Sequence, residues 1–170
     1  VYNWGEYIDE DVITQFEEET GIQAVYDVFE TNEEMYPVIE AGAVKYDVVC
    51  PSDYMIQRMI ENDLLAELNF DNIPNYQHIH EGFQGLYYDP DNQYSVPYTY
   101  GVVGIIYDAN QVDPADAQGW DLMWNEKYAG KILQFNNSRD AFGTAMYKDG
   151  LDVNTTDKAQ WDQALQTLLD

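Results

Sequence analysis

The sequence predicts an α/β protein with a mainly parallel sheet, and three observations support this prediction. Strand-like and helix-like patterns follow each other in turn through residues 1–65. The run YDVVCP (46–51) is almost continuously apolar, as expected of a strand that is buried on both faces. Hydrophobic residues make up 45% and aromatic residues 15% of the 170 residues, which is enough material for a packed core.

A strand, a helix and a second strand are expected first. VYNW (1–4) is typical of a strand end, and IDEDVITQFEEETG (8–21) has the apolar spacing of a helix. Asp9 is the expected N-cap of this helix, and Gly21 is expected to end it. IQAVYDVF (22–29) is rich in β-forming residues and predicts the next strand.

Two further helices and the buried strand complete a β-α-β-α-β-α order. In TNEEMYPVIEAG, Thr31 and Glu34 match a capping box, and Pro37 is expected in the first turns of this helix or at a kink. The strand YDVVCP (46–51) is followed by the helix DYMIQRMIENDLL (53–65). Regular alternation of this kind favours a parallel sheet.

The rest of the chain has a less regular pattern. Residues 69–94 predict loops with short helical turns, and DPDNQYS (89–95) predicts a plain turn because it lacks the later glycine and glutamate of a calcium loop. The other expected elements are one long or two consecutive strands over 95–108, a helix over 120–128, a strand over 131–135, and helices over 140–149 and from 157 onward. Because the chain starts in a strand pattern and stops in a helix pattern, we expect it to be part of a longer protein.

The charge balance is strongly acidic, with 32 acidic against seven basic residues and a formal net charge of −25. Such a field repels nucleic-acid phosphates and anionic lipid headgroups, so we expect neither as a partner. It attracts cations, but solubility or adaptation to salty surroundings explains the same composition. No stretch approaches the about 20 apolar residues of a membrane-spanning helix.

Cysteine and histidine suggest no metal or redox site. Cys50 is the single cysteine and is expected as a small buried core residue, and His78 and His80 lie in a polar stretch that predicts a loop. The motifs GxSxG, GxxxxGK[ST], GxGxxG and HExxH are all absent. We therefore expect no enzyme and no cofactor. A hydrolase with two carboxylates stays open as an alternative, because the many acids make any one pair uninformative.

Four short segments that follow predicted strands form the candidate site: NWGEY (3–7), FETNEE (29–34), PSDY (51–54) and NNSRD (136–140). Ligands of open α/β sheets bind just outside the carboxyl ends of the strands. Aromatic faces attract ammonium groups and pack against methylene chains, and carboxylates pair with amines, so the segments suit an elongated alkyl cation. The candidate contacts are Trp4, Glu6, Tyr7, Ser52, Tyr54, Asn137 and Asp140.

Most of these residues also have a purely structural explanation. Asn137 followed by Asp140 fits a helix cap, where the macrodipole favours an acid. Ser52 fits a position next to a cap, and Tyr7 and Tyr54 fit half-buried helix residues. Trp4 has the weakest structural explanation, because a loop at a strand end offers it little core.

The same segments resemble the spermidine/putrescine-binding proteins, the extracytoplasmic receptors of polyamine ABC transporters. The matching pieces are YNWGEYID, QFEEETGI, YDVFETNEEMY, YDVVCPSDYMIQRM, YSVPYTYG and NNSRDAFGTAMYKDG, in order over essentially all 170 residues. The resemblance implies a two-lobed, periplasmic-binding-protein-like fold of type II, of which the chain is an incomplete fragment. Lobe one would comprise 1–100, a strand crossing the hinge 101–108, and the beginning of lobe two 109–170.

The resemblance also implies a site and partners. The family's polyamine contacts fall on Trp4, Glu6, Tyr7, Ser52, Tyr54, Asn137, Ser138, Arg139 and Asp140. Gly5 stands where the best-known members have a hydroxyl residue, and Asn137 stands where they often have an acid. A receptor of the same fold for another small cation or a neutral solute is therefore the alternative. The implied ligand is putrescine or spermidine, the implied partners are the membrane permease subunits of an ABC importer, and the implied location is the periplasm or, for a lipoprotein, the cell surface.

Overall fold

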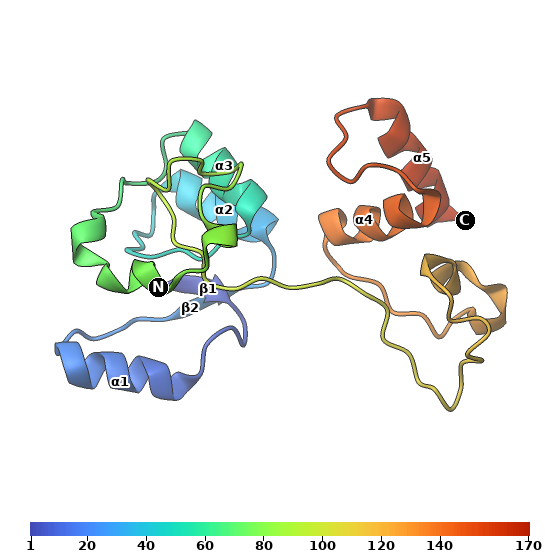
Figure 1. Cartoon of the computed structure of the whole chain (residues 1–170), viewed down its shortest axis with the longest axis horizontal. Helices are drawn as coiled ribbons and strands as arrows, with labels where there is room; N and C mark the ends of the chain where they lie inside the picture. Colours follow the sequence, from blue (N-terminus) through green and yellow to red (C-terminus); the bar gives the residue numbers. More distant parts are fainter. The chain divides into compact units, whose positions relative to one another are not determined.

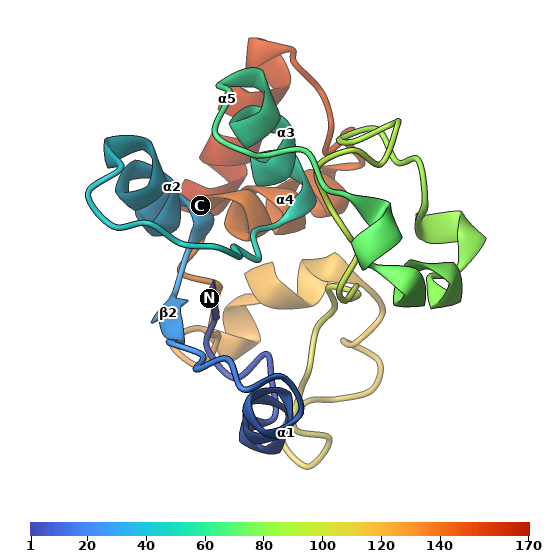
Figure 2. The same cartoon turned by 90° about the vertical axis from the view of Figure 1, so that its left-hand side faces the viewer.

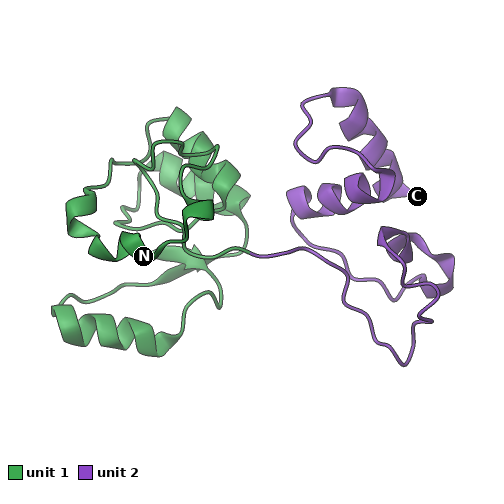
Figure 3. Ribbon diagram, viewed as in Figure 1, with its two compact units in different colours: residues 1–100 green, residues 101–170 purple.

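The computed structural model describes residues 1–170, which form two compact units (Figures 1 and 3). Unit 1 comprises Val1–Tyr100, and unit 2 comprises Gly101–Asp170. The acidic charge is concentrated in unit 1, which contains 21 of the 32 acidic residues and only Lys45 and Arg58 as basic side chains.

A short parallel sheet lies at the centre of unit 1. Strand β1 (Tyr2–Trp4) pairs in parallel with β2 (Asp27–Phe29), so that Trp4 lies opposite Phe29. On its other edge β1 meets residues 48–50: Tyr2 N donates to Val48 O, and Cys50 N donates to Tyr2 O, both at 2.9 Å. The parallel order predicted from the sequence is confirmed, but the strand expected over 22–29 covers only Asp27–Phe29, and the one expected over 46–51 is reduced to a single bridge between Val49 and Tyr2.

Helix α1 (Glu10–Thr20) follows β1 and begins and ends where the sequence predicts. The Asp9 carboxylate accepts from the Asp11 backbone N–H at 3.0 Å, and Gly21 ends the helix in the left-handed region at φ 71°. The helix contains no buried residue. Figures 1 and 2 show α1 on the opposite side of the β1–β2 pair from the other two helices of unit 1.

Helices α2 (Asn32–Ala41) and α3 (Asp53–Glu61) enclose the core of unit 1. The Thr31 hydroxyl caps α2 by accepting from the Glu34 N–H at 3.1 Å, which is one of the two hydrogen bonds of the expected capping box. Pro37 lies inside the helix. The buried core consists of Tyr2, Phe29, Met35, Tyr36, Met55 and Met59. These side chains come from both strands and both helices, so the core fixes the strand ends relative to the helix starts.

Residues 69–94 form turns and short helical segments, as predicted, whereas the helix expected over 53–65 ends at Glu61. Short 3₁₀ segments span Phe70–Asn72, Pro74–His78 and Glu81–Phe83. In the following turn the buried Asp89 carboxylate accepts hydrogen bonds from three backbone N–H groups and the Ser95 hydroxyl. This carboxylate therefore organises a turn, which agrees with the preference for a plain turn over a calcium loop.

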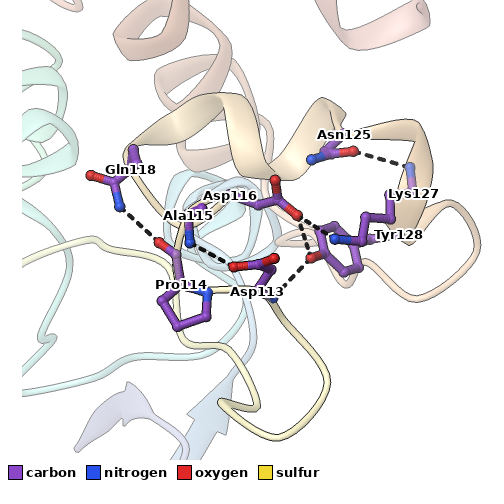
Figure 4. A network of polar contacts seen from close by, with 8 residues as sticks. All are labelled: Asp113, Pro114, Ala115, Asp116, Gln118, Asn125, Lys127 and Tyr128. Carbon is purple, nitrogen blue, oxygen red and sulfur yellow. Dashed lines mark hydrogen bonds and ion pairs between the residues drawn. The ribbon is translucent and has the colours of Figure 1, made fainter.

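Unit 2 is built on two helices and a pair of 3₁₀ segments. Helices α4 (Ser138–Asp149) and α5 (Lys158–Leu169) pack through Ala145, Met146 and Ala164. The helix expected over 120–128 is instead split into 3₁₀ segments at Trp120–Trp124 and Glu126–Tyr128. Asn125 separates them, because its side-chain oxygen accepts from the Lys127 N–H at 3.0 Å and starts a new turn (Figure 4).

The strands expected over 95–108 and 131–135 are not formed, and this includes the crossing strand at 101–108. A strand needs a neighbouring backbone to pair with. Val102, Ile106 and Leu133 are 91%, 100% and 96% exposed, so nothing in the chain covers them. The apolar pattern of these segments is typical of strands, but no other segment pairs with them, and the prediction of strands at these positions is wrong. No helix is long and apolar enough to cross a membrane.

Candidate ligand-binding site

An aromatic group lies where β1 ends. Trp4, the last residue of the strand, stacks on Tyr7 with ring centroids 6.0 Å apart and an interplanar angle of 30°. The other neighbour of the indole is Phe29, at 4.8 Å. Trp4 packs against the edge of the core and Tyr7 stays 47% exposed. The strand end thus offers more core to Trp4 than expected, and it presents an aromatic surface suited to an alkyl chain or a cation.

The loop between these rings holds a carboxylate in an unusual backbone conformation. Glu6 has φ 59°, in the left-handed region that few residues other than glycine adopt. The Tyr98 hydroxyl donates to the carbonyl of Tyr7 and ties the loop to a segment far away in the sequence. Residues with such a strained backbone conformation are often found at functional sites, where the surrounding structure holds the backbone in place. Glu6 is exposed and available to a ligand.

The start of α3 brings two candidate hydroxyls together through Asn32. Asn32 is only 1% exposed, and its amide nitrogen donates to Ser52 Oγ at 3.0 Å and to Tyr54 Oη at 2.8 Å. Its oxygen accepts from the Ser52 backbone N–H at 3.1 Å. Ser52 is the N-cap residue of α3 but makes no side-chain cap bond. Ser52 thus occupies the cap position itself, and its hydroxyl belongs to the Asn32 cluster instead of capping the helix.

Tyr54 has a second partner on α2. Its hydroxyl donates to Glu33 Oε1 at 3.0 Å. Asn32 and Glu33, which lie in the strand-end segment FETNEE, are thus neighbours of the candidate contacts that were not predicted as contacts themselves. The sequence indicates these two residues only by their position directly after β2. Their hydrogen bonds to Ser52 and Tyr54 join residues 20 to 22 positions apart, which no local sequence pattern indicates.

In unit 2 the segment Asn137–Asp140 forms the cap of α4. The Asn137 side-chain oxygen accepts from the Asp140 N–H at 3.0 Å, and its nitrogen donates to Asp140 Oδ2 at 2.8 Å. Ser138 and Arg139 are exposed in the first turn. The cap explanation of Asn137 and Asp140 is thus correct, and a ligand contact by either side chain would have to coexist with the cap.

The structure therefore brings the candidate residues together in three places. Trp4 and Tyr7 stack, Ser52 and Tyr54 share Asn32, and Asn137 pairs with Asp140. The first two places belong to unit 1, and Trp4 and Tyr54 both pack against its single core cluster. Both places lie where parallel strands or bridges end and helices begin, the position at which α/β sheets bind ligands.

The histidines and the cysteine lie outside the three places described above. The structure contains no group of three or more His, Cys, Asp or Glu side chains that could hold a metal ion. His80 Nδ1 accepts from the Gly82 N–H at 3.0 Å, a local turn contact. Cys50 is half-buried rather than fully buried, and burial raises the pKa of its thiol, which lowers its reactivity at neutral pH.

This architecture is an α/β fold in which aromatic and polar side chains lie at the strand ends, the position at which such folds bind ligands. The family model described as "Bacterial extracellular solute-binding protein" matches residues 11–170. The chain belongs to this family of bacterial extracellular solute-binding proteins.

Individual relatives are similar over nearly the whole chain. The spermidine/putrescine-binding periplasmic protein of Escherichia coli is 32% identical over 98% of this chain and 48% of its own length. The structure of the spermidine/putrescine ABC transporter substrate-binding protein PotD from Streptococcus pneumoniae is 38% identical, with a TM-score of 0.77 over 98% of this chain and 51% of that one. The TpPotD lipoprotein of Treponema pallidum is 33% identical, with a TM-score of 0.89 over 96% and 51%.

These comparisons confirm the resemblance to the spermidine/putrescine-binding proteins and the periplasmic-binding-protein-like fold. The chain spans about half the length of the curated relatives that it matches.

Proposed function

We propose that the protein is an extracytoplasmic receptor that captures a polyamine, putrescine or spermidine, for an ABC importer. The observation that carries the proposal is the aromatic and polar surface at the strand ends of unit 1, in a chain whose relatives are named for spermidine and putrescine binding. The importer's permease subunits would be its partners, in the periplasm or, as a lipoprotein, at the cell surface.

In this proposal the stacked rings of Trp4 and Tyr7 hold the methylene chain, and Glu6 pairs with one ammonium group. Ser52 and Tyr54 accept further N–H bonds. The candidate contacts in unit 2 are Asn137, Ser138, Arg139 and Asp140. Residues 1–100 would be lobe one, 101–108 the crossing to lobe two, and 109–170 the beginning of that lobe.

The proposal excludes catalysis as the main role. A receptor binds its ligand stoichiometrically and shifts between conformations that differ in ligand affinity. A hydrolase with two carboxylates would turn its substrate over. Gly5 and Asn137, the two departures from the best-known members, favour a second candidate of the same class: a receptor for another small cation or a neutral solute.

Isothermal titration of the intact protein with putrescine and spermidine tests the proposal. We expect stoichiometric binding and a marked loss of affinity for Trp4→Ala. Trp120→Ala is the matched control, because Trp120 stacks on Tyr147 at 5.6 Å in unit 2 without being a candidate contact. Heat from another solute and none from either polyamine would refute the polyamine assignment and favour the second candidate.

A further inference from the structure

The hydrogen bonds that lead from Ser52 to Glu33 have a fixed direction. The Ser52 N–H can only donate, and its acceptor is Asn32 Oδ1. This contact fixes which end of the Asn32 amide is the nitrogen, and that nitrogen donates to Tyr54 Oη at 2.8 Å. The phenol has one proton and cannot direct it at a donor, so the proton goes to Glu33 Oε1 at 3.0 Å.

This direction determines what Tyr54 can offer to a ligand. With its proton given to Glu33, the phenol oxygen acts toward a ligand only as an acceptor. Hydrogen bonds to an ionised carboxylate are about twice as strong as neutral ones, and linked hydrogen bonds polarise one another. An ammonium group has only donors, so an oxygen polarised in this way is well matched to an amine.

We propose that Glu33 is a positioning residue for amine binding, which acts on the ligand through the Tyr54 hydroxyl. This inference rests on the proposed polyamine-receptor function and deepens it. Glu33 need not touch the ligand, because it polarises the Tyr54 hydroxyl oxygen that accepts from the amine.

A purely structural role for Glu33 has to be separated from this one. Glu33 lies in the first turn of α2, where the helix macrodipole stabilises an acid of any kind. It also adds to the general acidity of unit 1. Glu33→Gln keeps the size of the side chain and an oxygen that accepts from Tyr54, and it removes the charge by replacing the other carboxylate oxygen with an NH2 group.

Glu40 offers a matched control on the same helix. It accepts from the Tyr36 hydroxyl at 3.0 Å, the same length as the Tyr54–Glu33 bond. Glu40→Gln therefore removes one charge and neutralises the same kind of tyrosine–carboxylate bond at a tyrosine outside the candidate site.

The experiment is isothermal titration of the intact protein with putrescine for wild type, Glu33→Gln, Tyr54→Phe, the double variant and Glu40→Gln. We expect Glu33→Gln to weaken binding about five- to tenfold, the difference between a charge-assisted and a neutral hydrogen bond. Glu40→Gln should change binding by less than about twofold. Glu33→Gln should have no further effect in the Tyr54→Phe background.

Three results would overturn the inference. An equal loss for Glu33→Gln and Glu40→Gln would show a general charge effect. An unreduced effect of Glu33→Gln in the Tyr54→Phe background would show that Glu33 does not act through this hydroxyl. A fall in the urea midpoint of Glu33→Gln that accounts for its whole loss of putrescine affinity would show a structural role. In all three cases wild type still binds putrescine; wild type that binds no polyamine would refute the proposed function and this inference with it.

Discussion

Asn32 should be the most sensitive polar residue of the candidate site, and Asn32→Ala tests this. The substitution removes three hydrogen bonds, to Ser52 Oγ, to Tyr54 Oη and from the Ser52 N–H, at a side chain that is 1% exposed. Each bond contributes about 0.5–1.5 kcal/mol net, and a donor left without an acceptor costs more. The better helix propensity of alanine offsets at most about 0.7 kcal/mol. The unfolding free energy should therefore fall by about 2–3 kcal/mol.

Urea denaturation followed by circular dichroism measures this loss, with Asn62→Ala as the control. Asn62 is exposed in the same unit and makes a single side-chain bond to the Arg58 carbonyl at 2.7 Å, so its loss should stay below about 1 kcal/mol. If Asn32→Ala cost no more than Asn62→Ala, the Asn32 cluster would not be a stabilising connection between α2 and α3, and the reasoning would be refuted.

Three further predictions concern charge, pH and the Gly5 position. Because the net charge is −25, raising the salt concentration from about 50 mM to about 1 M should raise the melting temperature by screening self-repulsion, and an unchanged or lower value would contradict this. The pKa of Asp89 is lowered, because hydrogen bonds from Ser95 and the backbone outweigh the opposite effect of burial. The carboxylate therefore stabilises the fold above its ordinary pKa of about 3.8, and this contribution is lost as the pH falls below that value. Asp89→Asn should therefore lower the unfolding free energy at pH 7 by about 2 kcal/mol and flatten its acid dependence, which urea titrations at several pH values check; equal acid slopes would argue against it. Gly5→Ser should change stability by less than about 0.5 kcal/mol, since nothing lies within 4 Å of an added Cβ, and a melting temperature several degrees lower would show otherwise.

The sequence predicted the starts of α1, α2 and α4 well because helix caps are local. Asp9, Thr31 and Asn137 each accept from a backbone N–H two or three residues further on, and such spacing is visible in the sequence. The strands at 101–108 and 131–135 could not be predicted in the same way. An apolar run shows that a segment is suited to pairing, but pairing depends on a partner strand elsewhere, and no segment of this structure pairs with these two.

In the candidate site, too, contacts between residues close in the sequence were predictable and contacts between distant residues were not. Trp4 and Tyr7 are three residues apart, so their association was expected from the sequence. Asn32 is in contact with Ser52 and Tyr54, which follow it by 20 and 22 residues, and no local pattern indicates such a contact. The sequence thus predicted the hydroxyls but not the buried amide that orients them.

The most direct test of the proposed function is a crystal structure of the intact protein with putrescine bound. We expect methylene groups against the rings of Trp4 and Tyr7 and an ammonium group within hydrogen-bond distance of Tyr54 Oη or the Glu6 carboxylate. Putrescine bound elsewhere, with these strand-end side chains in contact only with solvent, would contradict it.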